Sequence, residues 1–379
     1  MSYINRLYLP ENAIMMIKKE RIFMIGYSMD KGGVESYVRN ICEKLKDDFD
    51  IIYHWPVIVI DGKKWVLPRN RHNIFKYRRF WKRFFVENRF DVVYFNTCDI
   101  ISIDILRFAK NAGIPVRIIH SHNTGNQFPR KGLWGVMHRI MEKLSRRSLD
   151  KFATDLLACS KSAGDWMFDG RPYSVIKNGI DISKYDFSES KNARIAASLE
   201  KISKPAIACL GRIEGQKNSF FSLEIFREVC WVDKEAQCLF IGDGADRKEI
   251  EGLVHEYGLS DRILFTGPVD NVNEWLSYVD CILMPSVFEG LPFALVEAQA
   301  AGIHSLVSDT VSREADITGL VEYKSLADTP RSWAERVLRL AQMPRICVSQ
   351  KLAEAGFSIN NTAETVKTII KSRLSDEAR

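Results

Sequence analysis

The alternation of short apolar runs with longer amphipathic segments restricts the fold of this chain more than any other feature of its sequence. Apolar runs with the length of buried strands lie at 21–26, 91–95, 116–119, 156–159, 206–210, 237–242, 262–265 and 305–307. Helical patterns are expected to end at Leu45 and to cover 101–111, 245–257, 332–342 and 361–374. Strands that alternate with helices build parallel sheets with helices on both faces. The sequence therefore predicts an α/β protein.

The length of the chain indicates more than one domain. Its 379 residues exceed one ordinary domain and suit two domains of about 150 to 200 residues, each able to bury its own core. A polar stretch near 183–193 is expected to link them. Residues 1–16 contain no clear element, and Met15 and Met16 offer an alternative start of translation. We expect this leader to be disordered.

Composition places the chain among soluble globular proteins, with 46% hydrophobic and 27% charged residues. No apolar run is long enough to span a membrane, and the N-terminus lacks the pattern of a signal peptide. A cytoplasmic location is therefore expected. The eight cysteines include no Cys-x2-Cys pair and fall mostly within apolar patterns. They are expected to be buried free thiols rather than metal ligands.

Two glutamates frame the start of a predicted helix near the end of the chain. Cys281–Met284 is a short apolar run, and a helix is expected over 292–301, with Pro292 at its first position and Gly302 after its end. Glu289 precedes this helix and Glu297 lies on its second turn. Carboxylates accept hydrogen bonds from neighbouring hydroxyls, and a helix N-terminus attracts an anion. Hydroxyls at both ends with phosphates between them describe a nucleotide sugar, although helix capping and a solvated side chain would also account for the two glutamates.

Three segments of the second half resemble one family when they are taken together. Phe288–Gly302 resembles the Glu-x7-Glu signature of the retaining glycosyltransferases of family GT4, which have the GT-B fold. Cys209–Asn218 is similar to that family's strand followed by Gly-Arg, with a lysine five residues after the arginine. Val175–Asp181 is similar to its interdomain Asn-Gly-x-Asp turn. Their order and spacing match as well.

The resemblance implies two Rossmann-like, doubly wound domains that face each other across a cleft. Residues 17–182 would form the acceptor-side domain and 183–355 the nucleotide-sugar-binding domain, while 356–379 would form a helix that crosses back to the first domain. It further implies that Glu297 binds the ribose hydroxyls and Glu289 the hydroxyls of the donor sugar. Arg212 and Lys217 would stabilise the departing diphosphate, as cations do for developing negative charge. We see no Asp-x-Asp segment that would carry a divalent ion to the diphosphate, so neither a metal nor another cofactor is expected.

The remaining candidate residues lie in loops and turns. His120 and His122 follow the strand at 116–119, and a period of two places both rings on one side. By the resemblance His122 would lie near the donor sugar, with His120 orienting it. Gly32 and Gly33 would let the backbone approach phosphates. Further substrate-binding candidates are Asn178, Gly244, Val272, Gly290 and Leu291. Each could also be an ordinary turn or packing residue.

The net charge of +6 is unevenly distributed. Between Arg71 and Arg89 seven basic residues alternate with aromatic residues, and a second basic cluster runs from Arg130 to Lys151. The first segment suits the surface of an anionic membrane, or a helix whose aromatic side chains face the core while its charges face water. No nucleic-acid reader motif accompanies the charge, so nucleic acid is not an expected partner.

The sequence therefore predicts a retaining glycosyltransferase that moves a sugar from a nucleoside diphosphate sugar to a hydroxyl of a glycan or lipid-linked saccharide. Surface polysaccharide synthesis, such as that of capsule, exopolysaccharide or lipopolysaccharide, is the family's common setting. The enzyme would work in the cytoplasm, either free or at the inner face of the cell membrane. Two alternatives stay open at this stage: a nucleotide-sugar 2-epimerase on the same fold, and a non-catalytic subunit that binds nucleotide sugars.

Overall fold

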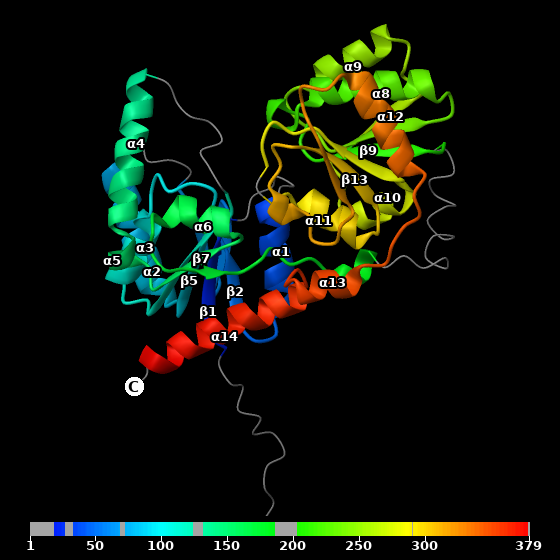
Figure 1. Cartoon of the computed structure of the whole chain (residues 1–379). Coiled ribbons are helices and arrows are strands. Elements are labelled where there is room, and N and C mark those ends of the chain that lie inside the picture. The colour runs from blue at the N-terminus through cyan, green and yellow to red at the C-terminus, as the bar shows by residue number, and fades with distance from the viewer. Residues whose placement is uncertain are drawn as a thin grey trace, which may run out of the picture.

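A computed structural model describes residues 19–26, 33–68, 73–123, 132–185, 203–289 and 291–377 of the chain. The leader, Gly32, Arg71, Gly290 and 186–193 of the expected linker lie outside these ranges. Two six-stranded parallel sheets occupy the two halves of the chain, each between helices (Figure 1).

The first sheet has the order β2-β1-β5-β6-β7-β8. Its strands are β1 (Arg21–Ile25), β2 (Asp50–Tyr53), β5 (Val92–Thr97), β6 (Val116–Ser121), β7 (Asp155–Ala158) and β8 (Ser174–Val175). Successive residues of β1 point to opposite faces, so Ile22 and Met24 pack in one core while Phe23 and Ile25 pack in the other. The sheet is therefore buried on both faces, as parallel sheets generally are.

Helices cover both faces of this sheet. They are α1 (Gly33–Leu45), α2 (Ile74–Asn88), α3 (Asp104–Asn111), α4 (Gly132–Arg147), α5 (Leu149–Phe152) and α6 (Lys161–Phe168). Side chains of α1 share a core with Ile22 and Met24, whereas α2, α3, α5 and α6 contribute to the core on the opposite face. A separate antiparallel hairpin, β3 (Val57–Ile60) and β4 (Lys63–Val66), packs Trp65 against the aromatic side chains of α2.

The second sheet has the order β11-β10-β9-β12-β13-β14. Its strands are β9 (Ala206–Leu210), β10 (Gln237–Ile241), β11 (Ile263–Gly267), β12 (Cys281–Met284), β13 (His304–Ser308) and β14 (Val321–Lys324). The helices are α8 (Ser219–Val232), α9 (Arg247–Glu256), α10 (Val272–Tyr278), α11 (Phe293–Ala300), α12 (Pro330–Ala341) and α13 (Ser349–Glu354). Helices α8, α9 and α12 pack on one face and α10 and α11 on the other. Short 3-10 turns lie at η1 (Ile182–Tyr185), η2 (Gly215–Lys217) and η3 (Arg313–Ala315).

The last helix, α14 (Ile359–Glu377), returns to the first half of the chain (Figure 1). Val366 and Ile370 are buried in the same core as Tyr37 of α1. Ion pairs from Lys371 to Glu20 and from Arg373 to Asp155 add to this packing. The C-terminal helix thus completes the core of a sheet whose strands, from Arg21 to Val175, lie far before it in the sequence.

The chain passes between the two halves twice, and the two passages lie side by side. Ile180 donates a backbone hydrogen bond to Phe357 and accepts one from Ile359, at 2.8 and 2.9 Å. A Cβ on Gly179 would come within 2.5 Å of Thr362 Oγ1 and 2.8 Å of the Ile359 backbone. Glycine is therefore needed at 179 for this close approach.

A strand lies at each expected run, and the differences have physical causes. Strand β6 extends to Ser121, so His120 belongs to the sheet rather than to the loop that follows it. The second sheet does not end at 305–307, because β14 pairs with β13 beyond it. Strands β2, β3, β4, β8 and β14 were not expected from the sequence; β8 has two residues and the other four have four each, so they offer little periodicity signal.

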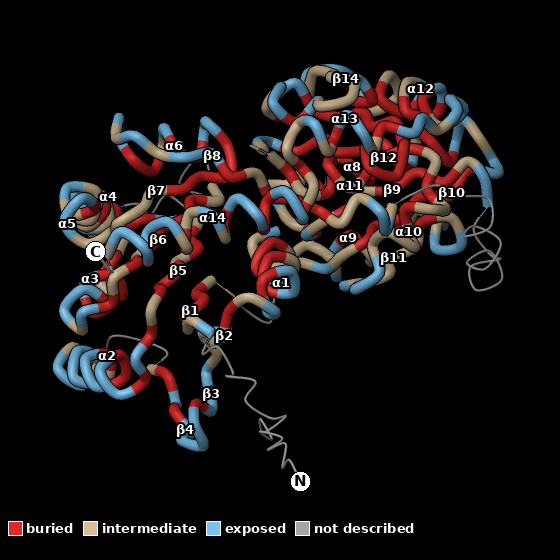
Figure 2. Tube along the Cα trace, turned by 90° about the horizontal axis from the view of Figure 1, so that it is seen from below, coloured by how far each residue is buried: buried red, intermediate tan, exposed pale blue. Residues whose placement is uncertain are grey.

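Helix α2 corrects the interpretation of the basic aromatic segment. Trp81, Phe84 and Phe85 are fully buried, and Phe80 packs against the same core, while Phe75 remains exposed. The cations of α2 face solvent, as the exposed side of this helix shows in Figure 2. The aromatic side chains of this segment other than Phe75 therefore pack in or against the domain core and are not free to enter a membrane.

Candidate functional site

A cleft of about 1040 Å³ lies between the two halves and is lined by both. On the second sheet it opens where β9 and β12 are neighbours and the chain leaves them toward opposite edges. In open α/β sheets, ligands bind at this switch point, beyond the carboxyl ends of the strands. The volume is at the upper end of the range for small-molecule pockets.

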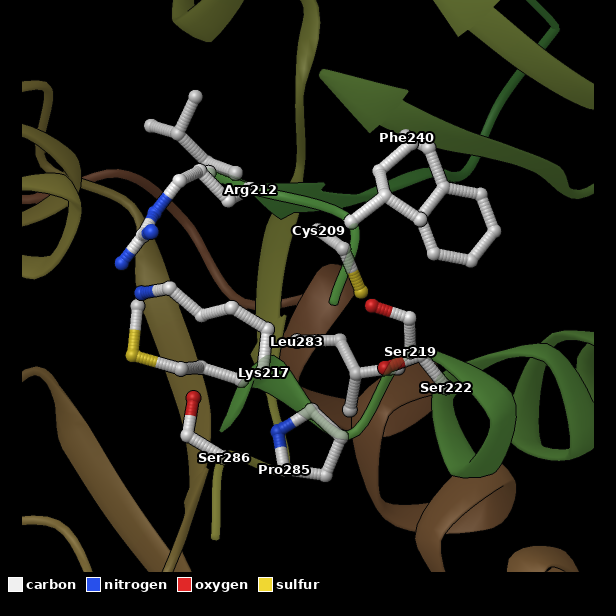
Figure 3. A pocket seen from close by; sticks show the side chains of 13 residues that line it. Cys209, Arg212, Lys217, Ser219, Ser222, Phe240, Leu283, Pro285 and Ser286 are labelled. Carbon is white, nitrogen blue, oxygen red and sulfur yellow. The ribbon is translucent and has the colours of Figure 1, made fainter. Parts of the chain in front are cut away.

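Two cations occupy the loop that follows β9. Arg212 and Lys217 both line the cleft, and Figure 3 shows their side chains next to each other with their terminal nitrogens on the same side. Arg212 is half exposed and pairs with Glu214 at 3.0 Å. Lys217 is mostly buried, and its Nζ lies 2.7 Å from Oε1 of Glu289. The predicted sugar-binding carboxylate and one predicted diphosphate cation therefore contact each other in the unliganded site.

Close backbone packing holds this loop in place. A Cβ on Gly242 would meet the carbonyl oxygen of Gly211 at 2.0 Å, and one on Gly244 would meet that of Ile213 at 2.2 Å. The Ile213 amide also donates to the carbonyl of Asp243 at 2.9 Å. Gly244 lines the cleft, and its lack of a side chain is required by the neighbouring loop that carries Arg212.

Helix α11 points its N-terminus into the cleft and carries Glu297. Pro292 is not the first helical residue, as the sequence predicted, but the cap before it, because its ψ of 126° is extended. Gly302 has a φ of +70°, which is the left-handed stop that was predicted. Leu291 and Val272, at the start of α10, line the same wall. Gly290 lies outside the described residues.

Glu297 is held by a tyrosine from the interdomain segment. The Tyr185 hydroxyl donates to Oε1 of Glu297 at 2.8 Å. Burial raises the pKa of Glu297 to about 7, and the hydrogen bond from Tyr185 opposes this shift. Burial and the nearby Glu297 charge also raise the pKa of Tyr185 above its usual value. Near neutral pH the carboxyl group is therefore close to half ionised.

The first domain supplies the opposite wall. Helix α1 begins at Gly33, and a Cβ there would lie 3.4 Å from the Phe293 ring of α11. The N-termini of α1 and α11 thus lie next to each other at the cleft wall, and a helix N-terminus is the positive end of a helix dipole. Gly32 lies outside the described residues.

The two histidines adopt different positions. His122 lines the cleft, while His120 is fully buried behind it, with the ring centroids 4.1 Å apart. His120 is hydrogen-bonded through Nδ1 to the Tyr94 hydroxyl at 3.0 Å. Burial lowers the pKa of His122 to about 3 and that of His120 well below its usual value. Both rings are therefore neutral at pH 7. His120 does not line the cleft but packs behind His122.

Asn96 determines which nitrogen of His122 carries the proton. Its Nδ2 donates to the carbonyl of Ile25 at 2.8 Å, which turns its Oδ1 toward Nε2 of His122 at 2.9 Å. Because a carbonyl oxygen only accepts, Nε2 of the neutral ring must be the donor. Nδ1 is left as an acceptor.

Asn178 lies on the first passage between the halves and lines the cleft. It is buried, and its side chain lies within hydrogen-bonding reach of His122, where it opposes the lowering of the pKa of that ring by burial. The predicted turn therefore contributes to the cleft wall as well as to the interdomain connection.

Three residues that contact the candidate site were not singled out from the sequence. They are Tyr185 beside Glu297, Asn96 beside His122 and Glu214 beside Arg212. Glu214 lies within the segment that carried the resemblance, so its spacing from Arg212 was a usable signal. Tyr185 reaches Glu297 across 112 positions, and no local pattern indicates such a pair.

Within the described ranges, no group of three or more His, Cys, Asp or Glu side chains is placed to hold a metal ion. Whether the reaction needs a metal stays open, and the absence of one remains a prediction. No helix in the same ranges has the length and apolar character to cross a bilayer. All eight cysteines are free, and Cys347 is exposed whereas the others are buried or partly buried.

Comparison with known proteins relates this geometry to a family. Residues 31–184 match the family described as Glycosyltransferase Family 4, and 204–343 match Glycosyl transferases group 1. The chain is 29% identical to the putative glycosyltransferase EpsF of Bacillus subtilis over 370 residues, which cover 90% of this chain and 94% of that protein. It is 23% identical to the capsular polysaccharide biosynthesis glycosyltransferase CapH of Staphylococcus aureus, with 72% and 74% covered.

Solved structures show the same fold at low sequence identity. HepE of Anabaena, in complex with UDP-glucose, superposes with a TM-score of 0.69 at 16% identity, over 93% of this chain and 99% of that one. Sucrose-phosphate synthase of Thermosynechococcus elongatus superposes with a TM-score of 0.70 at 16% identity, over 94% and 100%. The two family matches follow one another along the two halves that enclose the cleft. The chain is therefore a glycosyltransferase that belongs to the family 4 and group 1 enzymes of the GT-B fold.

Proposed function

We propose that this glycosyltransferase transfers a sugar from a nucleoside diphosphate sugar to a hydroxyl of a glycan or lipid-linked saccharide, with retention of the anomeric configuration. The observation that carries the proposal is the cleft itself, where Arg212, Lys217, Glu289 and Glu297 meet His122 across the two domains. Matches to proteins named for capsular polysaccharide and lipopolysaccharide core synthesis support a role in making a surface polysaccharide.

The charges of the cleft suit the parts of such a donor. Glu297 would accept hydrogen bonds from the ribose hydroxyls, and the N-termini of α1 and α11 would face the phosphates. Arg212 and Lys217 would take up the charge that develops on the leaving diphosphate, where fixed cations lower the barrier. Lys217 already contacts Glu289, so the donor sugar and diphosphate would bind next to a preformed ion pair.

The neutral His122 would orient the sugar without adding charge beside the anomeric carbon. Its tautomer is held by Asn96, so the ring is preorganised before the donor binds. Front-face attack, in which the leaving phosphate takes the acceptor proton, is the step that this arrangement would serve, because burial lowers the pKa of His122 to about 3 and makes its ring a weak proton acceptor.

The test is a donor panel followed by product analysis. A thermal-shift series with uridine, guanosine and adenosine diphosphate sugars identifies the donor, because a selective ligand at a hundredfold excess over Kd stabilises the fold by about 2.7 kcal/mol. Transfer to saccharide acceptors is then followed by nucleotide release and by NMR of the new linkage. Arg212→Gln and Lys217→Gln are expected to lower kcat by roughly a hundredfold or more.

Arg227→Gln is the matched control, since Arg227 lies on α8, pairs with Glu224 and does not line the cleft. An inverted linkage would contradict the proposed stereochemistry. Epimerised donor without transfer would establish the epimerase alternative, and donor that binds but stays intact with every acceptor would establish the binding-subunit alternative. The matched relatives named above are glycosyltransferases, which favours neither alternative.

A further inference from the structure

Helix α4 exposes an apolar stripe that no described residue covers. Its members are Leu133, Val136, Met137, Ile140 and Leu144, with exposed fractions of 78, 44, 43, 54 and 57%. Spacings of three and four residues place them on one face of the helix. Single exposed apolar residues are ordinary on a protein surface, but a continuous stripe marks an interaction site.

The opposite face of α4 is the polar one, and it is bonded to the domain. Ser145 donates to the carbonyl of Ile101 at 3.1 Å, and Arg146 donates to that of Met167 at 3.3 Å. Glu142 is buried and lies 3.8 Å from Arg146. The polarity of this helix is thus reversed relative to an ordinary surface helix, which turns its apolar face to the core.

Cations border the stripe. Arg139, Lys143 and Arg147 are exposed and recur every fourth residue, so they form a row along one side of it. The one carboxylate of α4, Glu142, lies on the buried face. The outward surface of the described helix therefore combines apolar and cationic side chains without an acidic one. Such helices lie in the headgroup region of anionic membranes.

We propose that α4 is the surface by which this protein docks on an anionic phospholipid bilayer, with the helix parallel to the membrane plane and Leu133, Ile140 and Leu144 inserted. Both α4 and α2 lie on the side of the first domain that faces away from the second (Figures 1 and 2). The exposed cations of α2, which include Lys76, Arg78 and Arg79, add long-range attraction. The membrane contact thus moves from α2, where the sequence suggested it, to α4.

The surface is linked to the cleft by a short segment of chain. Helix α4 begins nine positions after Asn123, which lines the cleft. Docking itself does not depend on the reaction, so failure of the proposed transfer would leave this inference standing.

The experiment is co-sedimentation of the full chain with vesicles. We expect binding to vesicles of phosphatidylcholine with about one third phosphatidylglycerol, binding at least about tenfold weaker to phosphatidylcholine alone, and loss of binding at high salt. Ile140→Glu with Leu144→Glu is expected to reduce partitioning by more than about tenfold. Lys143→Gln with Arg147→Gln is expected to reduce it by roughly 20-fold on anionic vesicles only.

Val59→Glu with Val66→Glu is the matched control, because these valines on β3 and β4 are each 64% exposed in the same domain. This pair should leave partitioning unchanged, and thermal shift with nucleotide should show that every variant is folded. Equal binding by the α4 variant and the wild-type protein would overturn the inference, as would absence of vesicle binding by the wild-type protein. Light scattering that shows a dimer, split by the α4 variant and indifferent to vesicles, would assign the stripe to a second copy instead.

Discussion

At the scale of single residues, the cleft is most sensitive to the ionisation of Glu297. Its carboxyl group is buried against one hydroxyl, that of Tyr185, and its pKa is raised to about 7. A carboxylate that accepts from two ribose hydroxyls must be ionised, whereas the protonated form offers one donor and loses acceptor capacity. If Glu297 binds the ribose as proposed, the affinity for nucleotide should therefore depend on pH within the physiological range.

Nucleotide affinity is expected to rise with pH between about 6 and 8. Calorimetric titration of the preferred nucleoside diphosphate across this range measures it. Glu297→Gln should bind more weakly, by roughly tenfold, and should lose the pH dependence. Tyr185→Phe should keep the dependence but move its midpoint upward, because the hydrogen bond from Tyr185 lowers the pKa of Glu297. A flat profile for the wild-type protein would contradict this account.

The effect on folding has the opposite sign. In the unfolded chain the pKa of Glu297 lies near 4.5, the ordinary value for a glutamate, whereas in the folded protein it is about 7. Between these values the folded state binds more protons, so this group's contribution to stability is lost as pH rises. The stability of the ligand-free protein and the nucleotide affinity should therefore respond to pH in opposite directions, with Glu297→Gln removing both responses.

Most candidate site residues could be found from the sequence because they belong to short, spaced segments. Arg212, Lys217, Glu289, Glu297 and His122 all line one cleft. Spacing alone could not show that His120 and His122 differ in position. Strand β6 continues through His120 and Ser121, and this extension buries the ring of His120. Tyr185 and Asn96 were beyond reach because their partners are distant in sequence.

At the scale of elements, the strands were predictable and the orientation of surface helices was not. The strand predictions relied on apolar runs that end at turn residues, and the parallel sheets confirm them. For α2 and α4, basic and apolar residues alternate in both sequences, so composition did not reveal which face is buried. The aromatic residues of α2 face inward and the apolar residues of α4 face outward, and only tertiary contacts distinguish the two cases.

The interdomain turn provides an element-scale prediction. Gly179→Ala is expected to destabilise the fold by roughly 1–3 kcal/mol, because the new Cβ would overlap Thr362 and the backbone of Ile359. Denaturant unfolding with a fluorescence readout measures the change. Gly252→Ala on α9 is the control, since a Cβ there meets nothing within 4 Å and should stabilise the helix by up to about 1 kcal/mol. Equal effects of the two substitutions would refute the packing argument.

At the scale of the whole molecule, the two structural halves are not two continuous stretches of the chain. Helix α14 follows the second sheet in sequence but packs with α1 in the core of the first. The boundaries expected at 182 and 355 remain predictions; the first sheet ends at Val175 and α14 begins at Ile359. The crossing of α14 to the first half was expected only because the resemblance implied it. The helical pattern of 361–374 does not indicate which domain the helix packs against.

A buried charge on α14 should therefore weaken the distant half of the chain. Val366→Asp places a carboxylate in the first core, where Val366 is fully buried, and is expected to cost several kcal/mol. Hydrogen exchange should become faster in β1, β5 and α1 while β9 and β12 keep their protection. Val86→Asp on α2, at an exposed valine, is the control. Faster exchange in β9 and β12 instead would show that α14 stabilises the second half of the chain, which would contradict the prediction.

The paired passages between the halves restrict how the enzyme can move. Because Ile180 is hydrogen-bonded to the chain on both sides of Ser358, the two crossings form one narrow bridge rather than two independent tethers. Rotation about that bridge changes the distance between the walls that carry His122 and Arg212, whereas sliding or separation would break its backbone bonds. Turnover should accordingly follow a single opening angle, and a cross-link at the far rim would arrest the catalytic cycle without touching any substrate contact.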